Sequence, residues 1–233
     1  MSDLEHENAH KLVWTSRTKR FRRQRPLTPY TLRRRNRRII SNAGFGHVGP
    51  LLDIPLEEGM SVMHTNFFGL VRLVNNVVPR MARRGHGTVV AVGSILGELP
   101  APFPWLLQRE QAALRSYTET LQMECKPLKV KVVLVAPGSI RSNIVGKLAY
   151  TLPEDSLYKS FERQIKRVMY QSQTAAYGVM DTDRFASVII GNVTSANPSP
   201  YISIGGFSTR TWLLKWLKRT WALDLLWNIT QRS

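Results

Sequence analysis

The stretch SNAGFGHVGP contains glycines at the spacing of a loop that cradles a dinucleotide pyrophosphate. Gly44, Gly46 and Gly49 fit the pattern G-x-G-x-x-G, whose backbone amides can bind phosphate at a helix N-terminus. Such a loop needs a helix directly after it and an acidic residue about 20 positions further on. Here Pro50 and LLDIPLEEG precede the next helical pattern, and residues 67–70 are FFGL. We therefore interpret the glycine spacing as accidental.

Short apolar runs alternate with longer helical patterns from Ile39 onward, which is typical of an α/β layer fold. Continuous β-branched runs predict buried parallel strands, whereas apolar residues three and four apart predict amphipathic helices. The expected strands are residues 87–94, 130–138 and 201–206, and the expected helices are residues 57–84, 104–126 and 181–193. With right-handed crossovers, these elements predict a Rossmann-like doubly wound parallel sheet with helices on both faces.

Four fragments in this order resemble the short-chain dehydrogenase/reductases: NAG at 42–44, Asn66 in HTNFFG, Ser94 in VVAVGSILG, and PGSIRS at 137–142. The resemblance extends from about Ile39 to Gly206, and the C-terminal part is most similar to fungal 1-acyldihydroxyacetone-phosphate reductases. It implies that Ser94 orients a carbonyl group and that Asn66 steadies a water that relays protons. It also implies NADP or NAD as the cofactor, bound by Asn42, Ala43, Gly44, Pro137, Gly138, Ile140 and Ser142.

Each of these residues also has a purely structural interpretation. Ser94 could satisfy backbone groups at a strand end, and Asn66 could bridge helix and sheet through hydrogen bonds. Pro137 and Gly138 could do no more than end a strand. The residues alone leave these alternatives open.

The proton donor that the resemblance implies is a tyrosine thirteen residues after the serine, followed four residues later by a lysine. The corresponding positions hold Leu107 and Gln111, directly before AALRSY. Leucine has no proton to transfer, and glutamine carries no charge that could lower a hydroxyl pKa. Glu110 lies one turn from Leu107 and could carry a proton if buried. We expect impaired reduction of a carbonyl on a lipid-like or other apolar substrate, or a non-catalytic pseudoenzyme that binds a membrane surface or a partner.

The family's phosphate loop is a glycine-rich motif on a first strand, well upstream of the NAG fragment. No glycine precedes Gly44 in this chain. The resemblance therefore implies a truncated Rossmann-like sheet, with a partial domain over residues 39–210 and a doubtful grip on the cofactor. The strand that ends at Asn42 would then be a sheet edge, which predicts a homo-oligomer or another partner covering it.

The chain has a formal net charge of +17, and residues 1–40 carry twelve Lys/Arg against three acids. The basic segment 1–38 has neither helical nor strand periodicity, which predicts disorder. Basic tails attract nucleic acid and anionic membranes, but no recognition fold accompanies this charge, so nucleic-acid binding is the least favoured function. His6 and His10 are too few to indicate a metal site.

Cys125 is the single cysteine, and the N-terminus lacks the apolar core of a secretory signal. These features predict a cytoplasmic protein in which Cys125 is a packing residue.

The last segment, residues 211–233, is rich in tryptophan. As one helix over residues 211–229, it would place its tryptophans on an apolar arc, with Lys215, Lys218 and Arg219 opposite. This pattern predicts a helix in a membrane interface, and hence a peripheral position on endoplasmic reticulum or lipid-droplet membrane. The alternatives are a helix packed on the domain's own face or on a second subunit.

Overall fold

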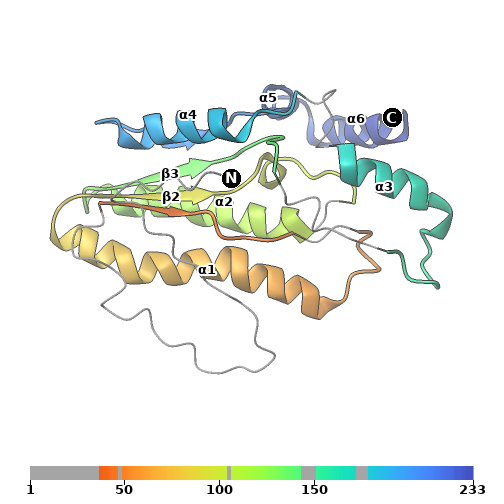
Figure 1. Cartoon of the computed structure of the whole chain (residues 1–233), viewed down its shortest axis with the longest axis horizontal. Helices are drawn as coiled ribbons and strands as arrows, with labels where there is room; N and C mark the ends of the chain where they lie inside the picture. Colours follow the sequence, from red (N-terminus) through yellow and green to blue (C-terminus); the bar gives the residue numbers. More distant parts are fainter. Residues whose placement is uncertain (1–36, 47–48, 104–105, 143–150, 172–177, 233) are drawn as a thin grey trace.

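The computed structural model describes residues 37–46, 49–103, 106–142, 151–171 and 178–232 (Figure 1). Within them, four parallel strands form one sheet in the order β1-β2-β3-β4. The strands are β1 (Arg38–Ser41), β2 (Gly87–Val92), β3 (Val130–Val135) and β4 (Tyr201–Ile202). Except for Arg37 and Arg38, the basic segment 1–38 lies outside the described residues, as do His6 and His10.

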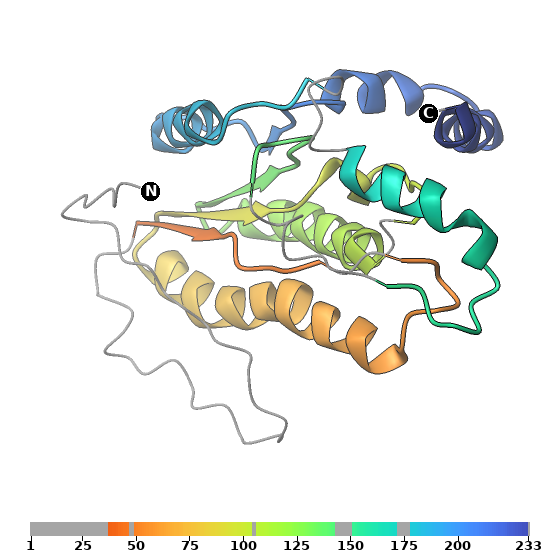
Figure 2. The same cartoon turned by 45° about the vertical axis from the view of Figure 1, so that its right-hand side comes forward.

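Helices cover both faces of this sheet, as the sequence predicts. On one face lie α1 (Leu56–Arg83) and α2 (Leu106–Cys125), and on the other lies α4 (Thr182–Thr194). Two short helices, α5 (Ser208–Leu214) and α6 (Arg219–Arg232), follow on the side of α4 in both views (Figures 1 and 2). The expected α/β class and doubly wound parallel arrangement are therefore confirmed for the described part of the chain.

Alternating side chains of β2 and β3 supply the two cores. Val89 and Ala91 point to the side of α1 and α2, whereas Val90 points to the side of α4. On β3, Val132 and Val133 divide in the same way. Because both faces are covered, neither strand has a polar face, and this explains their uninterrupted apolar sequences.

Helix α1 is stabilised by favourable residues at both of its ends and by an apolar face that packs on the sheet. Pro55 precedes its first turn, Glu57 and Glu58 lie in that turn, and Arg80 and Arg83 lie in the last turn, which favours the helix dipole. Its buried side chains recur three and four residues apart and pack on the sheet beside those of α2. They are Val62, Asn66, Leu70, Val74, Val77, Val78 and Met81.

Cys125 ends α2 inside the same core with 1% of its surface exposed, which confirms its prediction as a packing residue. Burial raises the pKa of its thiol.

The structure corrects three element boundaries. The predicted strand 201–206 contains only Tyr201 and Ile202 as a strand, because the chain then turns to pair Gly206 with Ser139. The predicted strands 87–94 and 130–138 end at Val92 and Val135, where regular strand gives way to the loops of the carboxyl edge.

The single C-terminal helix predicted over 211–229 is wrong. Residues between Leu214 and Arg219 leave the helical path, so two helices replace one.

The strand β1 pairs only with β2 among the described residues, as expected for a sheet edge. Ile39 packs under it, but Ile40 on its other face is 48% exposed. Arg38 crosses to the end of α4, where its Nε donates to the carbonyl oxygen of Val193 at 2.8 Å. The edge is thus partly covered from within the chain, and an external partner for it stays a prediction.

Of residues 143–180, the stretches 143–150 and 172–177 lie outside the described part. Between them, α3 (Glu162–Gln171) follows a short 3-10 turn at Lys159–Phe161. Leu152 and Ile165 are buried there against Phe103 and Tyr158 in a small separate cluster. Its apolar side chains therefore serve at least in part as local packing.

No helix in the described part of the chain is long and apolar enough to span a bilayer.

Candidate active site

The carboxyl ends of β1, β2 and β3 meet at one edge of the sheet and bring the predicted fragments together. The amide of Gly93, after β2, donates to the carbonyl oxygen of Val135 at 2.7 Å. The amide of Ile95 donates to the carbonyl oxygen of Pro137 at 3.1 Å. The Ser94 loop is thereby fixed to the start of the PGSIRS fragment. In parallel sheets, ligands bind at this carboxyl edge.

Ser94 begins a 3-10 turn at Ile95–Gly97 in an extended backbone conformation. Its Oγ accepts a hydrogen bond from the amide of Leu96 at 3.2 Å. The hydroxyl thus caps the turn, as the structural alternative requires. Its own proton can still be donated to a substrate oxygen, because a hydroxyl is donor and acceptor at once.

Asn66 links α1 to the loop after β1. Its Oδ1 accepts from the amide of Phe45 at 3.1 Å, and its Nδ2 donates to the carbonyl oxygen of Phe45 at 2.8 Å. A Cβ at Gly44 would lie 3.1 Å from Oδ1, so this close approach favours glycine. The side chain is 6% exposed and bridges helix and sheet, which is its structural interpretation. Its role in a proton relay stays a prediction.

Glu110 lies against Asn66 and is completely buried. Its Oε1 accepts from Nδ2 of Asn66 at 3.0 Å, while Oε2 accepts no hydrogen bond. Burial raises the pKa of this carboxyl from 4.5 to about 7, although the hydrogen bond from Asn66 partly opposes the change. The sequence analysis required Glu110 to be buried if it is to carry a proton, and it is buried. A pKa near 7 suits proton transfer, but the carboxyl is enclosed between α1 and α2.

Leu107 and Gln111 both lie in the first turns of α2. The side chain of Leu107 falls outside the described part, whereas Gln111 is buried with 8% exposure. A Cβ added to Gly93 would lie 3.0 Å from Oε1 of Gln111. The glutamine therefore sits beside the residue that precedes Ser94. That Gln111 occupies the lysine position of the family stays a prediction.

The predicted cofactor residues lie on two of the loops at this edge. Asn42, Ala43 and Gly44 are exposed directly after β1. After β3, the amide of Ser139 donates to the carbonyl oxygen of Gly206 at 2.8 Å, and a Cβ at Gly138 would overlap that oxygen. Pro137, Gly138 and Ile140 are thus half-buried by chain packing, whereas Ser142 is exposed. The proposed contacts of all seven residues with a cofactor stay predictions.

The loop containing Gly44, Gly46 and Gly49 does not lead into a helix. Residues 50–55 follow the last glycine, and α1 begins at Leu56. No helix N-terminus therefore adjoins the glycines, as the accidental interpretation requires.

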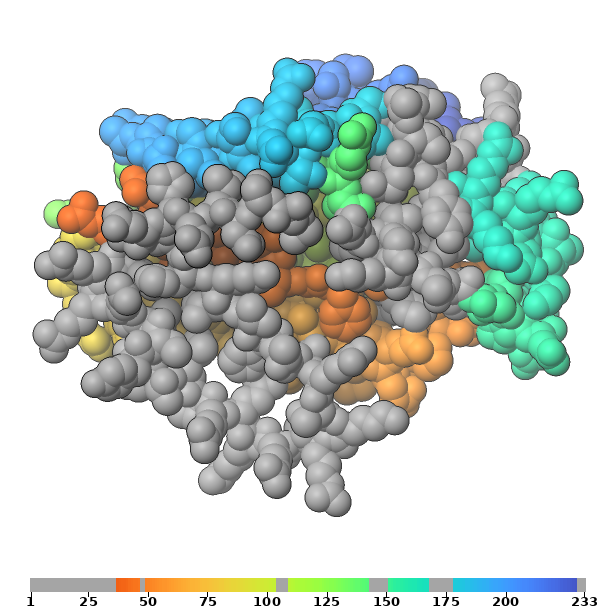
Figure 3. All heavy atoms as spheres, viewed as in Figure 1, coloured from red at the N-terminus to blue at the C-terminus, as the bar shows by residue number. Residues whose placement is uncertain are grey.

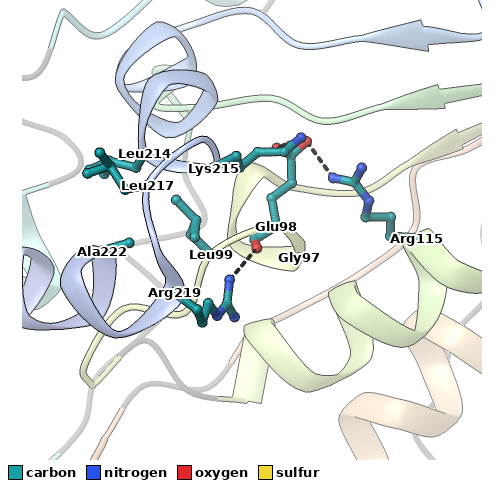
Figure 4. A pocket seen from close by; sticks show the side chains of 9 residues that line it. All are labelled: Gly97, Glu98, Leu99, Arg115, Leu214, Lys215, Leu217, Arg219 and Ala222. Carbon is teal, nitrogen blue, oxygen red and sulfur yellow. Dashed lines mark hydrogen bonds and ion pairs between the residues drawn. The ribbon is translucent and has the colours of Figure 1, made fainter.

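Sequence reasoning missed an ionic cluster around Glu98, which directly follows the Ser94 turn (Figure 4). The Glu98 side chain is 3% exposed, and its oxygens lie 2.7 Å from Nη1 of Arg115 and 2.8 Å from Nζ of Lys215. Both cations also lie over the ring of Tyr201. Lys215, expected on the exposed polar face of a C-terminal helix, instead ties α5 to the domain. No local pattern signals this contact, since Glu98 and Lys215 are 117 residues apart in the sequence.

A cavity of about 290 Å³ opens beside this cluster. It lies between the turn after Ser94, α2 and the C-terminal helices, and its lining is drawn in Figure 4. Among the described residues, no group of three or more His, Cys, Asp or Glu is placed to hold a metal ion.

Comparison with known proteins agrees with this arrangement. The short chain dehydrogenase family model matches residues 37–152. The short-chain dehydrogenase PC-15 of Penicillium crustosum is 30% identical over 155 residues, which cover 66% of this chain and 56% of that protein. The NADPH-dependent 1-acyldihydroxyacetone phosphate reductase of Schizosaccharomyces pombe is 31% identical over 132 residues, covering 54% and 44% of the two chains.

Among solved structures, a short-chain dehydrogenase from Streptomyces avermitilis superposes with a TM-score of 0.65 at 24% identity. The match covers 84% of this chain and 67% of that chain, and it supports the fold. The chain spans about half the length of the curated relatives that it matches. The matched segment, the parallel sheet and the residues at its carboxyl edge agree: this chain belongs to the short-chain dehydrogenase/reductase family of oxidoreductases.

Proposed function

We propose that this chain binds NADP or NAD at the carboxyl edge of its sheet and reduces a carbonyl on an apolar, lipid-like substrate only slowly. The observation that carries the proposal is the position of Gln111, packed beside Gly93 and thus next to Ser94. A neutral amide stands where the family's reaction uses an ammonium, and Leu107 stands at the position of the hydroxyl.

The residues present fit the binding of such a cofactor better than they fit proton transfer. Oε1 of Gln111 is buried without a hydrogen-bond partner, and a ribose hydroxyl could donate to it. The exposed residues Asn42 to Gly44 offer backbone and amide groups at the neighbouring strand end. A bound reduced nicotinamide supplies the hydride in this chemistry.

The remaining steps fall to the chain's own side chains. Ser94 can donate its hydroxyl proton in a hydrogen bond and so orient a carbonyl oxygen. Neither Leu107 nor Gln111 can deliver a proton to that oxygen. Loss of a positioned general acid slows a reaction by roughly 10²- to 10⁴-fold.

The lipid-like substrate class rests on similarity alone. The Schizosaccharomyces pombe relative is named for the reduction of an acyl lipid.

Cofactor binding is tested by titrating the full chain with NADPH and with NADH. Ala43→Asp places a negative charge on the proposed cofactor-binding edge and should weaken binding at least about tenfold. The matched control is Ala196→Asp, an exposed alanine in the turn between α4 and β4, which should bind as the wild type does. Absence of binding to the wild type would rule the proposal out in favour of a non-catalytic protein.

The impairment is tested by restoring the missing pair. Leu107→Tyr combined with Gln111→Lys should raise NADPH-dependent reduction of an apolar ketone by about 10²-fold or more. Leu107→Phe combined with Gln111→Lys has the same bulk without the hydroxyl and should give no such increase. Equal rates for both double variants would show that proton donation at position 107 does not limit the reaction.

The second candidate is a non-catalytic protein that acts at a membrane surface. The exposure of tryptophans on α5 and α6 favours it. The two candidate functions can be distinguished by experiment, because the non-catalytic protein would bind lipid but not NADP or NAD.

A further inference from the structure

The C-terminal helices join the rest of the chain at the ionic cluster around Glu98 and at the cavity beside it. Among the described side chains of these helices, Thr211 on α5 and Ala222 on α6 are buried, with 7% and 1% exposure. Lys215, at the end of α5, reaches Glu98. In Figures 1 and 2, both helices lie at the outside of the molecule, on the side of the sheet that α4 covers. Figure 3 shows this layer along the upper border of the molecule.

The tryptophans of this segment are more exposed than buried, whereas Leu214 and Leu217 line the cavity beside Glu98. Trp216 is 77% exposed and Trp221 is 65% exposed, and more than half of Trp212 is also exposed. We define the tryptophan surface as these three residues together with Leu213. The rings of Trp212 and Trp216 contact each other edge to face, with centroids 6.1 Å apart. Exposed apolar clusters of this kind mark interaction sites.

The charge of the segment selects among possible partners. Residues 208–232 contain five Lys/Arg and one Asp, so their formal charge is +4. Two copies that met through this surface would bring like charges together, whereas an anionic bilayer attracts them. Tryptophan also suits the bilayer interface, because its ring is apolar and its N–H needs a polar partner.

We propose that α5 and α6 dock on an anionic lipid bilayer, with Trp212, Trp216 and Trp221 inserted at headgroup depth. The helices lie in the plane of the membrane, as their lengths of 7 and 14 residues require. The ion pair of Glu98 with Lys215 holds α5 in the orientation that presents the tryptophans outward. Docking would place the Ser94 turn and its neighbouring cavity close to the lipid, because both adjoin these helices.

The test measures co-sedimentation of the full chain with vesicles of phosphatidylcholine alone or with added phosphatidylserine. The wild type should bind the phosphatidylserine vesicles, and binding should weaken as salt is added. Trp216→Ala combined with Trp221→Ala should reduce binding by about tenfold or more, because two rings no longer leave water. Lys218→Glu should also weaken binding, but only to the anionic vesicles.

The matched control removes two exposed apolar side chains that lie outside the C-terminal helices. Leu52 and Phe68 are 71% and 46% exposed, before and within α1. Leu52→Ala combined with Phe68→Ala should bind vesicles as the wild type does. All variants are compared by circular dichroism, and brominated lipids should quench wild-type tryptophan fluorescence if the rings insert.

Three outcomes overturn the proposal. One is a wild-type protein that does not bind phosphatidylserine vesicles. Another is equal loss of binding in the tryptophan pair and in the Leu52 and Phe68 control. The third is a lipid-free dimer, seen by analytical ultracentrifugation, that the tryptophan pair abolishes, which would assign the surface to a second copy of the chain.

Discussion

The helices α1 and α2 and the C-terminal helices α5 and α6 use apolar side chains in opposite directions. On α1, Leu70 and Met81 are almost fully enclosed against the sheet. On α5 and α6, the buried positions are Thr211 and Ala222, while the tryptophans face outward. An apolar stripe therefore predicts that a helix will dock, but it does not say whether the partner is the helix's own domain.

The two regions also differ in how charge is used. Between α1 and α2, the carboxyl of Glu110 is enclosed with one oxygen lacking a hydrogen bond. At α5, the carboxyl of Glu98 is enclosed as well, but Arg115 and Lys215 both contact it. Burial of Glu110 therefore destabilises the fold to an extent that depends on pH. At α5, ion pairs to Glu98 hold the helix on the domain.

The largest effect should come from truncating the enclosed stripe. Leu70→Ala should lower the free energy of unfolding by about 2–5 kcal/mol, because it leaves a cavity in the core between α1 and the sheet. Urea denaturation followed by circular dichroism measures this. A loss below about 1 kcal/mol would mean that this core is loosely packed and that the contrast with α5 is overstated.

The buried carboxyl of Glu110 should make the free energy of unfolding depend on pH. The folded chain binds this proton more tightly than the unfolded chain, because the pKa rises from 4.5 to about 7 on folding. The linked stabilisation is fully present below about pH 4.5 and is lost as the pH rises through 7, for a total of about 3 kcal/mol.

Glu110→Gln should remove this dependence and stabilise the protein at pH 8 relative to the wild type. Urea melts at pH 5 and pH 8 provide the comparison, with Glu124→Gln as the control, since Glu124 is an exposed carboxyl on the same helix. A wild type whose stability does not fall between these pH values would contradict the burial of Glu110.

A smaller effect is expected at the ionic cluster. Glu98→Gln keeps the shape of the side chain but removes the charge that Arg115 and Lys215 share, at a cost of about 1–2 kcal/mol. The loss should appear as faster hydrogen exchange in α5 and α6, with α1 and α2 unchanged. Equal acceleration throughout the chain would show that the cluster stabilises the whole domain rather than its C-terminal layer.

The smallest effect should follow truncation of the outward stripe. Leu213 is 56% exposed, so Leu213→Ala should change the free energy of unfolding by less than about 0.5 kcal/mol. This substitution removes the same atoms as Leu70→Ala, and the pair therefore measures the contrast between the two regions directly. A loss near that of Leu70→Ala would place the C-terminal helices within the folded core.

Much of the fold could be predicted because its signals are local. The uninterrupted apolar runs of β2 and β3 and the helical spacing in α1 predicted the parallel sheet and its covering helices. The ends of the strands could not be placed as well. The turn that pairs Gly206 with Ser139 shortens β4, and it depends on chain that is more than 60 residues away.

The candidate site was predicted in part. The order of the fragments predicted roles for Ser94 and Asn66 and placed Leu107 and Gln111 at the proton-transfer positions, and the structure brings Gln111 next to the Ser94 turn. The sequence could not decide that Asn66 binds the backbone of Phe45 and the carboxyl of Glu110. Those bonds join three segments whose approach only the folded chain defines.

The sequence by itself determined the class of the sheet and the family, since each is carried by residue identity and spacing along the chain. Only the tertiary structure decided that Glu110 is enclosed, that Lys215 pairs with Glu98, and that the tryptophans of α5 and α6 face outward. Burial, pKa and helix orientation depend on which distant segments pack around a side chain. The hydrophobic periodicity of the sequence does not specify those neighbours.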